Sequence, residues 1–294
     1  MDADRHKLSA RLEEEGIWYL PLKGIILKDL YPEFGMRQMS DNDILVDASR
    51  MKDIRAIMES IGFTPERLGK GYHDVYFKPP VSNFEIHNTL FQPDRRDELY
   101  NYYRDVPDRL LGEGCEKHMS DEDLYVYLAA HEYKHYTRGG TGLRSLADTF
   151  LYLQKVKPDM DYVAAETEKL GISDFEQANR SLAVHLFGDE DLTAEDRKML
   201  DYITESGTYG TVSHSVENKV KELGGGTKGK IRYLLRRMFK PMDEVRQYYP
   251  TFAKHPFLLP FLPFLRMGKA LTVKRHKMRQ EIKTLFHLER KRKD

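Results

Sequence analysis

An Asp-x-Asp pair placed directly before an apolar run is the feature that most constrains this chain. Residues 41–46 read Asp-Asn-Asp-Ile-Leu-Val, which is typical of a buried strand that emerges into solvent at its acidic end. Side chains alternate across a strand, so Asp41 and Asp43 project to one face and can bind a hard cation between them. Acidic pairs are also common on solvated strand edges, so the pair predicts a metal site only together with its neighbours.

The segments on either side of this pair alternate between helix and strand patterns. Gly16 ends the first helix, Pro32 ends the second and Gly62 follows the third. The expected helices cover residues 4–15, 24–31 and 50–61, and the expected strands cover residues 17–22, 41–46, 73–77 and 83–87. This order of elements predicts a small α/β unit.

After Pro93 only helical periodicity remains. The expected helices cover residues 121–136, 143–156, 162–170, 175–187, 195–205, 212–223, 231–239 and 271–287. The triplet Gly224-Gly225-Gly226 is the best candidate for a linker. The sequence therefore predicts an α+β protein, with an α/β domain in residues 1–100 and a helical domain in residues 101–294.

Length and composition are those of an ordinary soluble protein. The 294 residues are 40% hydrophobic and 32% charged, which is enough for two domains with a sizeable core. The single cysteine, Cys115, excludes an internal disulfide framework and favours a cytoplasmic location. Residues 1–16 lack the apolar core of a secretion signal. We expect no membrane span, because the longest apolar run, residues 257–265, is far shorter than the roughly 20 residues required.

Charge is distributed unevenly along the chain. Residues 228–294 contain 19 Lys/Arg against 5 Asp/Glu, and residues 1–227 contain 28 against 42. A basic segment from about residue 228 can mark a nucleic-acid surface. We favour a helix that packs against the acidic part of the protein, and not an RNA-binding arm, because apolar residues recur at helical spacing among the charges of this segment. These apolar residues are Leu271, Met278, Ile282 and Leu285.

Three motifs in the first third of the chain carry a resemblance to a known family. They are Leu22-Lys23-Gly24 before a helix, Arg37 with Ser40-Asp41-x-Asp43, and Phe84-Glu85-Ile86-His87. In this order and spacing they resemble the poorly characterised nucleotidyltransferase family of the DNA polymerase β-like superfold. The Lys-Gly and Arg-x-x-Ser-Asp-x-Asp pattern is also similar to the toxin nucleotidyltransferases of type IV toxin–antitoxin systems.

The resemblance implies transfer of a nucleoside monophosphate from an NTP to an acceptor, which can be a small molecule or a macromolecule. It implies that Mg²⁺ or Mn²⁺ is held by Asp41, Asp43 and Glu85. The NTP would be bound by Lys23, Gly24, Arg37 and Ser40. Two alternatives remain open within the same family: a toxin-like enzyme that modifies tRNA, and an inactive nucleotide-binding module.

A competing motif lies in the helical region. Residues 131–135 read His-Glu-Tyr-Lys-His, a literal H-E-x-x-H on a helix, which is the pattern of a zinc hydrolase. No third histidine follows at the longer metzincin spacing, although Glu166 and Glu168 are possible ligands. The same histidines can instead support a nucleotide site. Possible supporting residues around that site are His87, His131, His135, Arg144 and Asp148.

Overall fold

The computed structural model describes residues 1–69, 71–94, 97–207, 211–272 and 275–290. The chain separates into two compact units. The first contains residues 1–130 and 148–173, and the second contains residues 131–147 and 174–294. Helices α5 (Asp121–Arg138) and α6 (Leu143–Lys155) each run from one unit into the other. The division at residue 100 that the sequence suggests stays a prediction.

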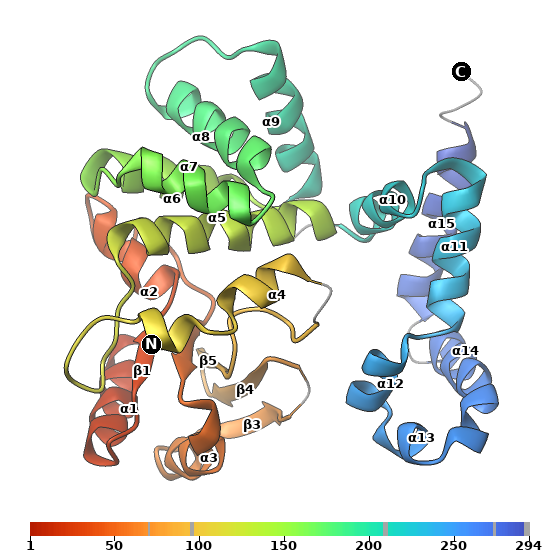
Figure 1. Ribbon diagram of the computed structural model, residues 1–294, viewed down its shortest axis with the longest axis horizontal. Helices are drawn as coiled ribbons and strands as arrows, with labels where there is room; N and C mark the ends of the chain where they lie inside the picture. Colours follow the sequence, from red (N-terminus) through yellow and green to blue (C-terminus); the bar gives the residue numbers. More distant parts are fainter. Residues whose placement is uncertain (70, 95–96, 208–210, 273–274, 291–294) are drawn as a thin grey trace. The chain divides into compact units, whose positions relative to one another are not determined.

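A five-stranded mixed sheet forms the centre of the first unit, in the order β1-β2-β5-β4-β3 (Figure 1). Strands β2 and β5 are parallel, and the other three neighbouring pairs are antiparallel. The strands are β1 (Tyr19–Pro21), β2 (Asn42–Val46), β3 (Thr64–Arg67), β4 (His73–Lys78) and β5 (Ser82–His87). Helices dominate the chain after residue 97, so the predicted α+β class is confirmed.

Helices α1 (Asp2–Glu14) and α3 (Met51–Ser60) pack against one face of this sheet (Figure 1). The apolar residues that this face contributes to the core are Ile44, Val46, Tyr76, Phe84 and Ile86. Because side chains alternate along each strand, the residues between them point to the opposite face. That opposite face carries Asp43, Glu85 and His87 at the positions that alternate with the core residues.

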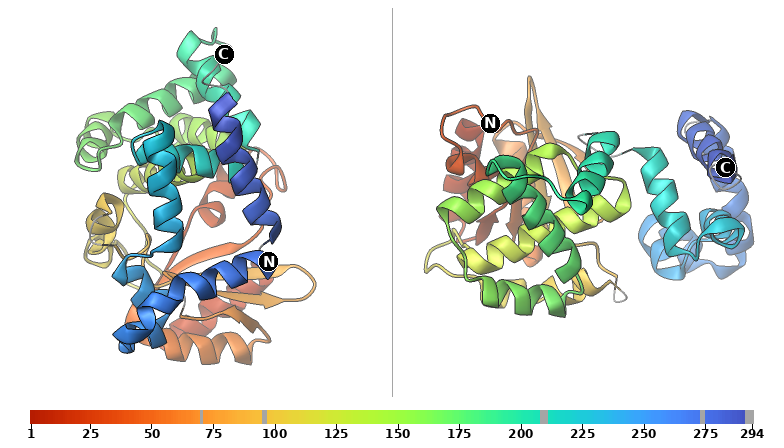
Figure 2. Two further views of the ribbon diagram at one scale, coloured as in Figure 1. Left: turned by 90° about the vertical axis from the view of Figure 1, so that its right-hand side faces the viewer. Right: turned by 90° about the horizontal axis from the view of Figure 1, so that it is seen from above.

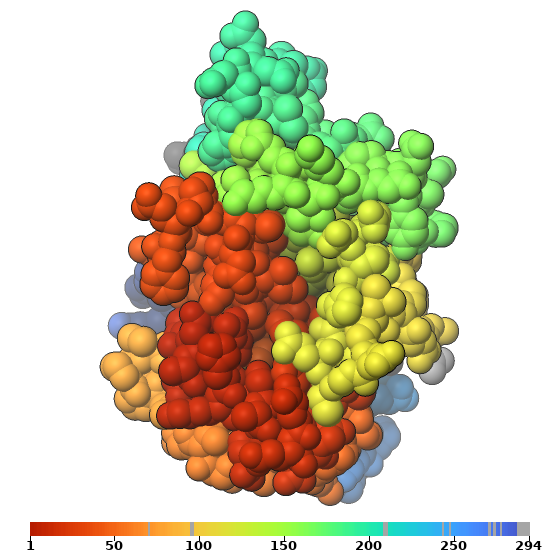
Figure 3. Space-filling view, turned by 90° about the vertical axis from the view of Figure 1, so that its left-hand side faces the viewer, coloured from red at the N-terminus to blue at the C-terminus, as the bar shows by residue number. Residues whose placement is uncertain are grey.

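The free edge of β1 is covered by a segment that follows α4 (Glu98–Tyr103) and the 3₁₀ helix η3 (Val106–Arg109). The Tyr19 amide donates to the Cys115 carbonyl at 2.8 Å, and the Lys117 amide donates to the Tyr19 carbonyl at 2.7 Å. Figure 3 shows this yellow segment lying against the red N-terminal residues. These two bonds satisfy backbone groups that an open edge strand would leave exposed.

The sequence pattern predicted four of the five strands but did not predict β3. Its residues, Thr-Pro-Glu-Arg, are mostly exposed and show no apolar alternation. Pro65 has no amide to donate, and such a residue is tolerated at the edge of a sheet. The helix expected over residues 24–31 consists of α2 (Gly24–Leu27) and a 3₁₀ turn, η1 (Lys28–Leu30). Helices are thus largely where the apolar periodicity predicts them.

The later helices include α7 (Met160–Lys169) in the first unit and the bundle of residues 212–290 in the second (Figure 2). The helices of the second unit that follow α6 are α8 (Ser173–Phe187), α9 (Ala194–Ser206), α10 (Val212–Glu222), α11 (Gly226–Met238), α12 (Met242–Tyr248), α13 (Pro250–Lys254), α14 (Leu262–Thr272) and α15 (Arg275–Arg290). None of the helices within the described ranges is long and apolar enough to cross a membrane.

Two expectations about the last third of the chain are corrected. The glycine triplet is not a linker between domains, because α10 ends at Glu222, α11 begins at Gly226, and the two helices share one core. The helix expected over residues 271–287 is divided between α14 and α15. Lys274 falls outside the residues that the structure describes. The role proposed for the basic segment stays a prediction.

We expect Gly229→Ala to destabilise the packing of α10 against α11. A Cβ at Gly229 would lie 2.4 Å from the Val220 carbonyl oxygen, which is backbone and has little freedom to move. Such overpacking costs about 1–3 kcal/mol, although alanine is otherwise favoured over glycine in a helix by about 1 kcal/mol. Urea unfolding of the full chain measures the change.

Gly268→Ala in α14 is the matched control, because a Cβ there would meet nothing within 4 Å. It should leave the unfolding free energy unchanged or raise it. Equal stability of the two variants would contradict close packing at Gly229.

Candidate active site

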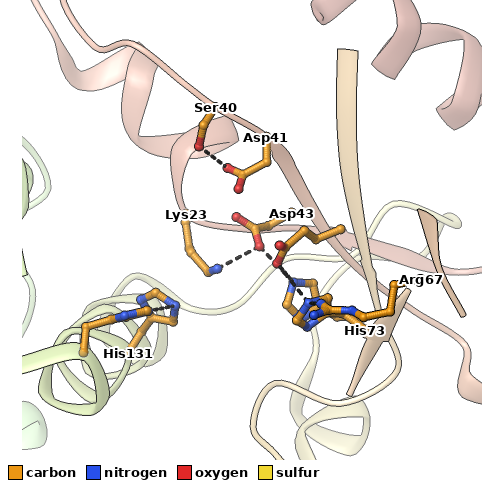
Figure 4. A network of polar contacts seen from close by, with 10 residues as sticks. Lys23, Ser40, Asp41, Asp43, Arg67, His73 and His131 are labelled. Atoms are coloured by element: carbon orange, nitrogen blue, oxygen red, sulfur yellow. Dashed lines mark hydrogen bonds and ion pairs between the residues drawn. The ribbon is translucent and has the colours of Figure 1, made fainter. Parts of the chain in front are cut away.

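Three carboxylates occupy the start of β2 and the neighbouring strand β5. Asp43 and Glu85 are direct partners in the parallel register of β2 and β5, so they share one face of the sheet. Asp41 directly precedes β2 and is two residues before Asp43 (Figure 4). Ser40 Oγ donates a hydrogen bond to Asp41 Oδ1 at 3.1 Å. The structure thus places Asp43 and Glu85 side by side, with Asp41 directly before the strand that carries Asp43.

Asp43 is buried and is held by two nitrogen groups (Figure 4). Lys23 Nζ donates to Asp43 Oδ1 at 2.8 Å, and His87 Nε2 shares a hydrogen bond with the same oxygen at 2.8 Å. Burial by itself raises the pKa of Asp43, but Lys23 and His87 outweigh it and hold that pKa well below its usual range. Burial likewise lowers the pKa of Lys23, and the negative charge of Asp43 more than restores it. Both groups are therefore charged.

Glu85 is in a different electrostatic environment. Burial raises the pKa of its carboxyl group, and the negative charge of Asp43 raises it further. The groups within 4 Å of its Oε2 atom include His73 Nε2 at 3.6 Å and His87 Nε2 at 3.7 Å. An added cation on this face would favour the ionised form of Glu85.

His73 is the residue of this cluster that the sequence did not single out. It opposes His87 in the antiparallel register of β4 and β5, and the two ring centroids are 5.0 Å apart. Burial and the neighbouring His87 lower the pKa of His73 to about 3, so its ring is neutral at physiological pH. The Arg67 guanidinium contacts His73 Nε2 from β3. The hairpin turn is centred on Pro80, and this register pairs residue 73 with residue 87. The position of the turn in the sequence could therefore have predicted that His73 lies opposite His87.

The Lys23-Gly24 motif forms a tight turn between β1 and α2. The Ile25 amide donates to the Leu22 carbonyl at 3.2 Å, which closes the turn. Lys23 has φ +45° and ψ −111°, a conformation that glycine adopts easily and a lysine adopts only under strain. At Gly24 a Cβ would lie 2.6 Å from Arg37 Nη1, so glycine allows the guanidinium to pack against the turn.

Arg37 forms a buried two-point ion pair with Asp148. Its Nε and Nη2 atoms donate to the two carboxylate oxygens at 2.7 and 2.8 Å, and the Tyr31 hydroxyl donates to Asp148 Oδ1 at 2.8 Å. The Arg37 side chain is only 7% exposed. This geometry ties the loop before Asp41 to α6, which fits a positioning role for Arg37 and Asp148.

The remaining sequence candidates belong to the second unit. His131 Nε2 and His135 Nε2 are 3.2 Å apart. Glu132 is buried and accepts a hydrogen bond from Asn179 Nδ2 at 3.4 Å. Within the described ranges, no third histidine, cysteine or carboxylate completes a metal-binding group with this pair. Arg144 is exposed at the second position of α6.

Comparison with known proteins gives one family match. The model of a family described as "Uncharacterised nucleotidyltransferase" matches residues 1–188 of the 294. Among solved structures, the chain is similar to "Antibiotic-Resistance Factor ANT(2'')-Ia", with 12% sequence identity and a TM-score of 0.34 over 64% of this chain and 94% of that chain. No curated protein matches the sequence.

We expect Lys23→Gly to be more stable than Lys23→Ala by about 1 kcal/mol, because only glycine relieves the backbone strain at this position. Both variants remove the ammonium group and leave Asp43 with its hydrogen bond to His87, so each should be less stable than the parent chain. Urea unfolding of the two variants isolates the backbone contribution. Equal unfolding free energies would argue against strain at Lys23.

Glu85→Gln should change stability in a pH-dependent way. Because the pKa of Glu85 is raised in the folded protein, the fold binds its proton more tightly than the unfolded chain does. The parent chain therefore loses stability as pH rises from the unfolded pKa through the folded pKa. In metal-free protein, the variant should be more stable than the parent at pH 7, and the difference should shrink towards about pH 4. A pH-independent difference would contradict this assignment.

Proposed function

Because the chain belongs to the family of uncharacterised nucleotidyltransferases, we propose that it transfers a nucleoside monophosphate from an NTP to an acceptor in a reaction that depends on Mg²⁺ or Mn²⁺. The observation that carries the proposal is the pairing of Asp43 with Glu85 on adjacent parallel strands, with Asp41 two residues before Asp43. Asp41, Asp43 and Glu85 supply carboxylate oxygens from two neighbouring strands, and such oxygens are suitable ligands for hard divalent cations.

The residues present fit such a cation. Carboxylate oxygens are the ligands that Mg²⁺ prefers, and Asp41, Asp43 and Glu85 offer them. The Lys23 ammonium already supplies a positive charge at Asp43 Oδ1, and burial together with the negative charge of Asp43 raises the pKa of Glu85. When bound, the metal would stabilise the charge on the attacking and leaving oxygens.

Lys23 and Gly24 would contact the triphosphate. The Lys23 ammonium lies beside the acidic residues and presents a positive charge where phosphate oxygens would approach them. Gly24 leaves room for the Arg37 guanidinium against the turn, which would place a second positive charge near the phosphates. In this proposal Lys23 pairs with Asp43 in the free protein and with phosphate in the NTP complex.

Arg37 and Ser40 would orient the acidic loop. Arg37 donates two hydrogen bonds to Asp148, so its guanidinium braces the loop. Ser40 fixes the direction of the Asp41 carboxylate. While its Nε2 atom is free of metal, His87 would orient Asp43 by the hydrogen bond that the two share. These contacts reduce the motion of the acidic residues before substrate binds, which is the usual contribution of supporting residues to catalysis.

Glu85 is the best candidate for the group that receives the acceptor's proton. A general base works best when its pKa lies near the working pH, and burial moves the pKa of Glu85 upward. Glu85 would otherwise serve as the third metal ligand. The acceptor would carry a hydroxyl or an amine, because these groups attack the α-phosphorus of an NTP.

The experiment that tests this function incubates the protein with each α-labelled NTP and Mg²⁺. Separate reactions contain cell extract, small hydroxyl or amine acceptors, or tRNA. Label in a small product supports transfer to a small molecule, and label in tRNA supports the toxin-like alternative. Absence of label in every reaction, from protein that still binds NTP, would support the inactive-module alternative.

Asp41→Asn and Asp43→Asn should each lower labelling by at least about 100-fold, because an amide keeps the side-chain shape but removes the charge that holds the metal. Far-UV circular dichroism checks that each variant is folded. The matched control is Asp53→Asn on the exposed surface of α3, which removes a carboxylate away from the site. Full activity in Asp41→Asn and Asp43→Asn would remove the basis of the proposal.

A further inference from the structure

Two imidazoles and a carboxylate converge on the sheet face that carries the acidic residues. His73 comes from β4, while Glu85 and His87 come from β5. Each contributes one ligand atom, and these three atoms all lie within 4.8 Å of one another. Asp43 adds a second carboxylate, whose Oδ1 atom is 2.8 Å from His87 Nε2, and a metal ion at this nitrogen would replace that hydrogen bond. The cluster therefore spans three neighbouring strands of the sheet.

The distances within this cluster are those of a nearly formed metal site. Glu85 Oε2 lies 3.6 Å from His73 Nε2 and 3.7 Å from His87 Nε2. In a tetrahedral site with bonds of about 2.0–2.1 Å, neighbouring ligand atoms are about 3.3 Å apart. Shifts of a few tenths of an ångström would bring the Glu85 oxygen to that distance from each of the two nitrogens.

The chemistry of the donors differs from that of the three-carboxylate set. Mg²⁺ prefers ligands that are all oxygen, whereas imidazole nitrogen favours first-row transition metals. We propose that His73, Glu85 and His87 form a binding site for one divalent transition-metal ion, such as Mn²⁺, Co²⁺ or Zn²⁺. The inference deepens the proposed function, because it names the class of metal that enters the Glu85 side of the same sheet face.

Ring stacking is the ordinary alternative for this cluster. Tyr72 packs against both imidazoles, with ring centroids 4.6 Å from His73 and 5.6 Å from His87. Stacking accounts for the close approach of the rings. It does not account for a carboxylate oxygen placed within 3.7 Å of both Nε2 atoms. That arrangement is what favours a shared cation.

Arg67 would regulate access to the site. Its guanidinium contacts His73 Nε2, the atom that would bind the metal. Arg67 lies on the exposed edge strand β3, so its side chain can turn into solvent. A metal ion must displace this positive charge, and the removal of Arg67 should therefore strengthen metal binding.

The test titrates Co²⁺ into the metal-free full-length protein, followed by visible absorption and calorimetry, without any nucleotide. We expect one tightly bound Co²⁺ per chain, held at least about 100-fold more tightly than Mg²⁺. His73→Asn should lower Co²⁺ affinity by at least about 10-fold and leave Mg²⁺ affinity unchanged. Arg67→Gln should raise Co²⁺ affinity.

Two controls separate this site from other histidines. His6→Asn removes an exposed histidine of α1, and the double change His131→Asn with His135→Asn removes the i, i+4 pair of α5. Neither should affect the tight Co²⁺. If the bound Co²⁺ is lost in the α5 variant, or is unchanged in both His73→Asn and Arg67→Gln, the inference is wrong.

The Co²⁺ titration can be interpreted separately from the test for nucleotide transfer. Tight Co²⁺ binding without any nucleotide labelling would support the metal site and reject the proposed transfer function. Labelling that depends on Asp41 and Asp43, together with weak Co²⁺ binding, would support the transfer function and reject the metal site. Trp18 fluorescence confirms that each variant is folded before either measurement is interpreted.

Discussion

The buried ion pair between Lys23 and Asp43 is the interaction on which the rest of the site depends. A carboxylate whose side chain is only 9% exposed would cost several kcal/mol if it stayed ionised without a partner. Lys23 reaches it from the turn after β1, and His87 reaches it from β5, so each strand beside β2 contributes one partner. The ion pair with Asp43 therefore holds the Lys23-Gly24 turn against this face of the sheet.

This ion pair is formed at the expense of local strain. Lys23 adopts a backbone conformation that suits glycine, and Gly24 beside it leaves room for the Arg37 guanidinium. Arg37 in turn is held by Asp148 and packs against the turn at Gly24. Strain at a turn, a close glycine contact and a buried ion pair in one place are typical of a site selected for function rather than for stability.

Much of this arrangement follows from short-range rules that a sequence expresses. The period of two along β2 and β5 predicts which residues face the core, and therefore that Asp43 and Glu85 face away from it. The hairpin turn also determines that His73 opposes His87, although that register was not used to find His73. Contacts between distant segments could not be predicted in this way. The Arg37–Asp148 pair spans 111 residues, and no local pattern specifies it.

The strand order determines where the carboxylate and imidazole side chains lie on the sheet. Asp43 lies on β2 and His73 on β4, and β5 between them carries both Glu85 and His87. Glu85 therefore lies between Asp43, its partner in the register, and His73, whose Nε2 atom is 3.6 Å from Glu85 Oε2. Lys23 and Arg67 place a positive side chain at each end of this row. The balance between these two side chains, more than the carboxylates alone, would then determine which metal the site accepts.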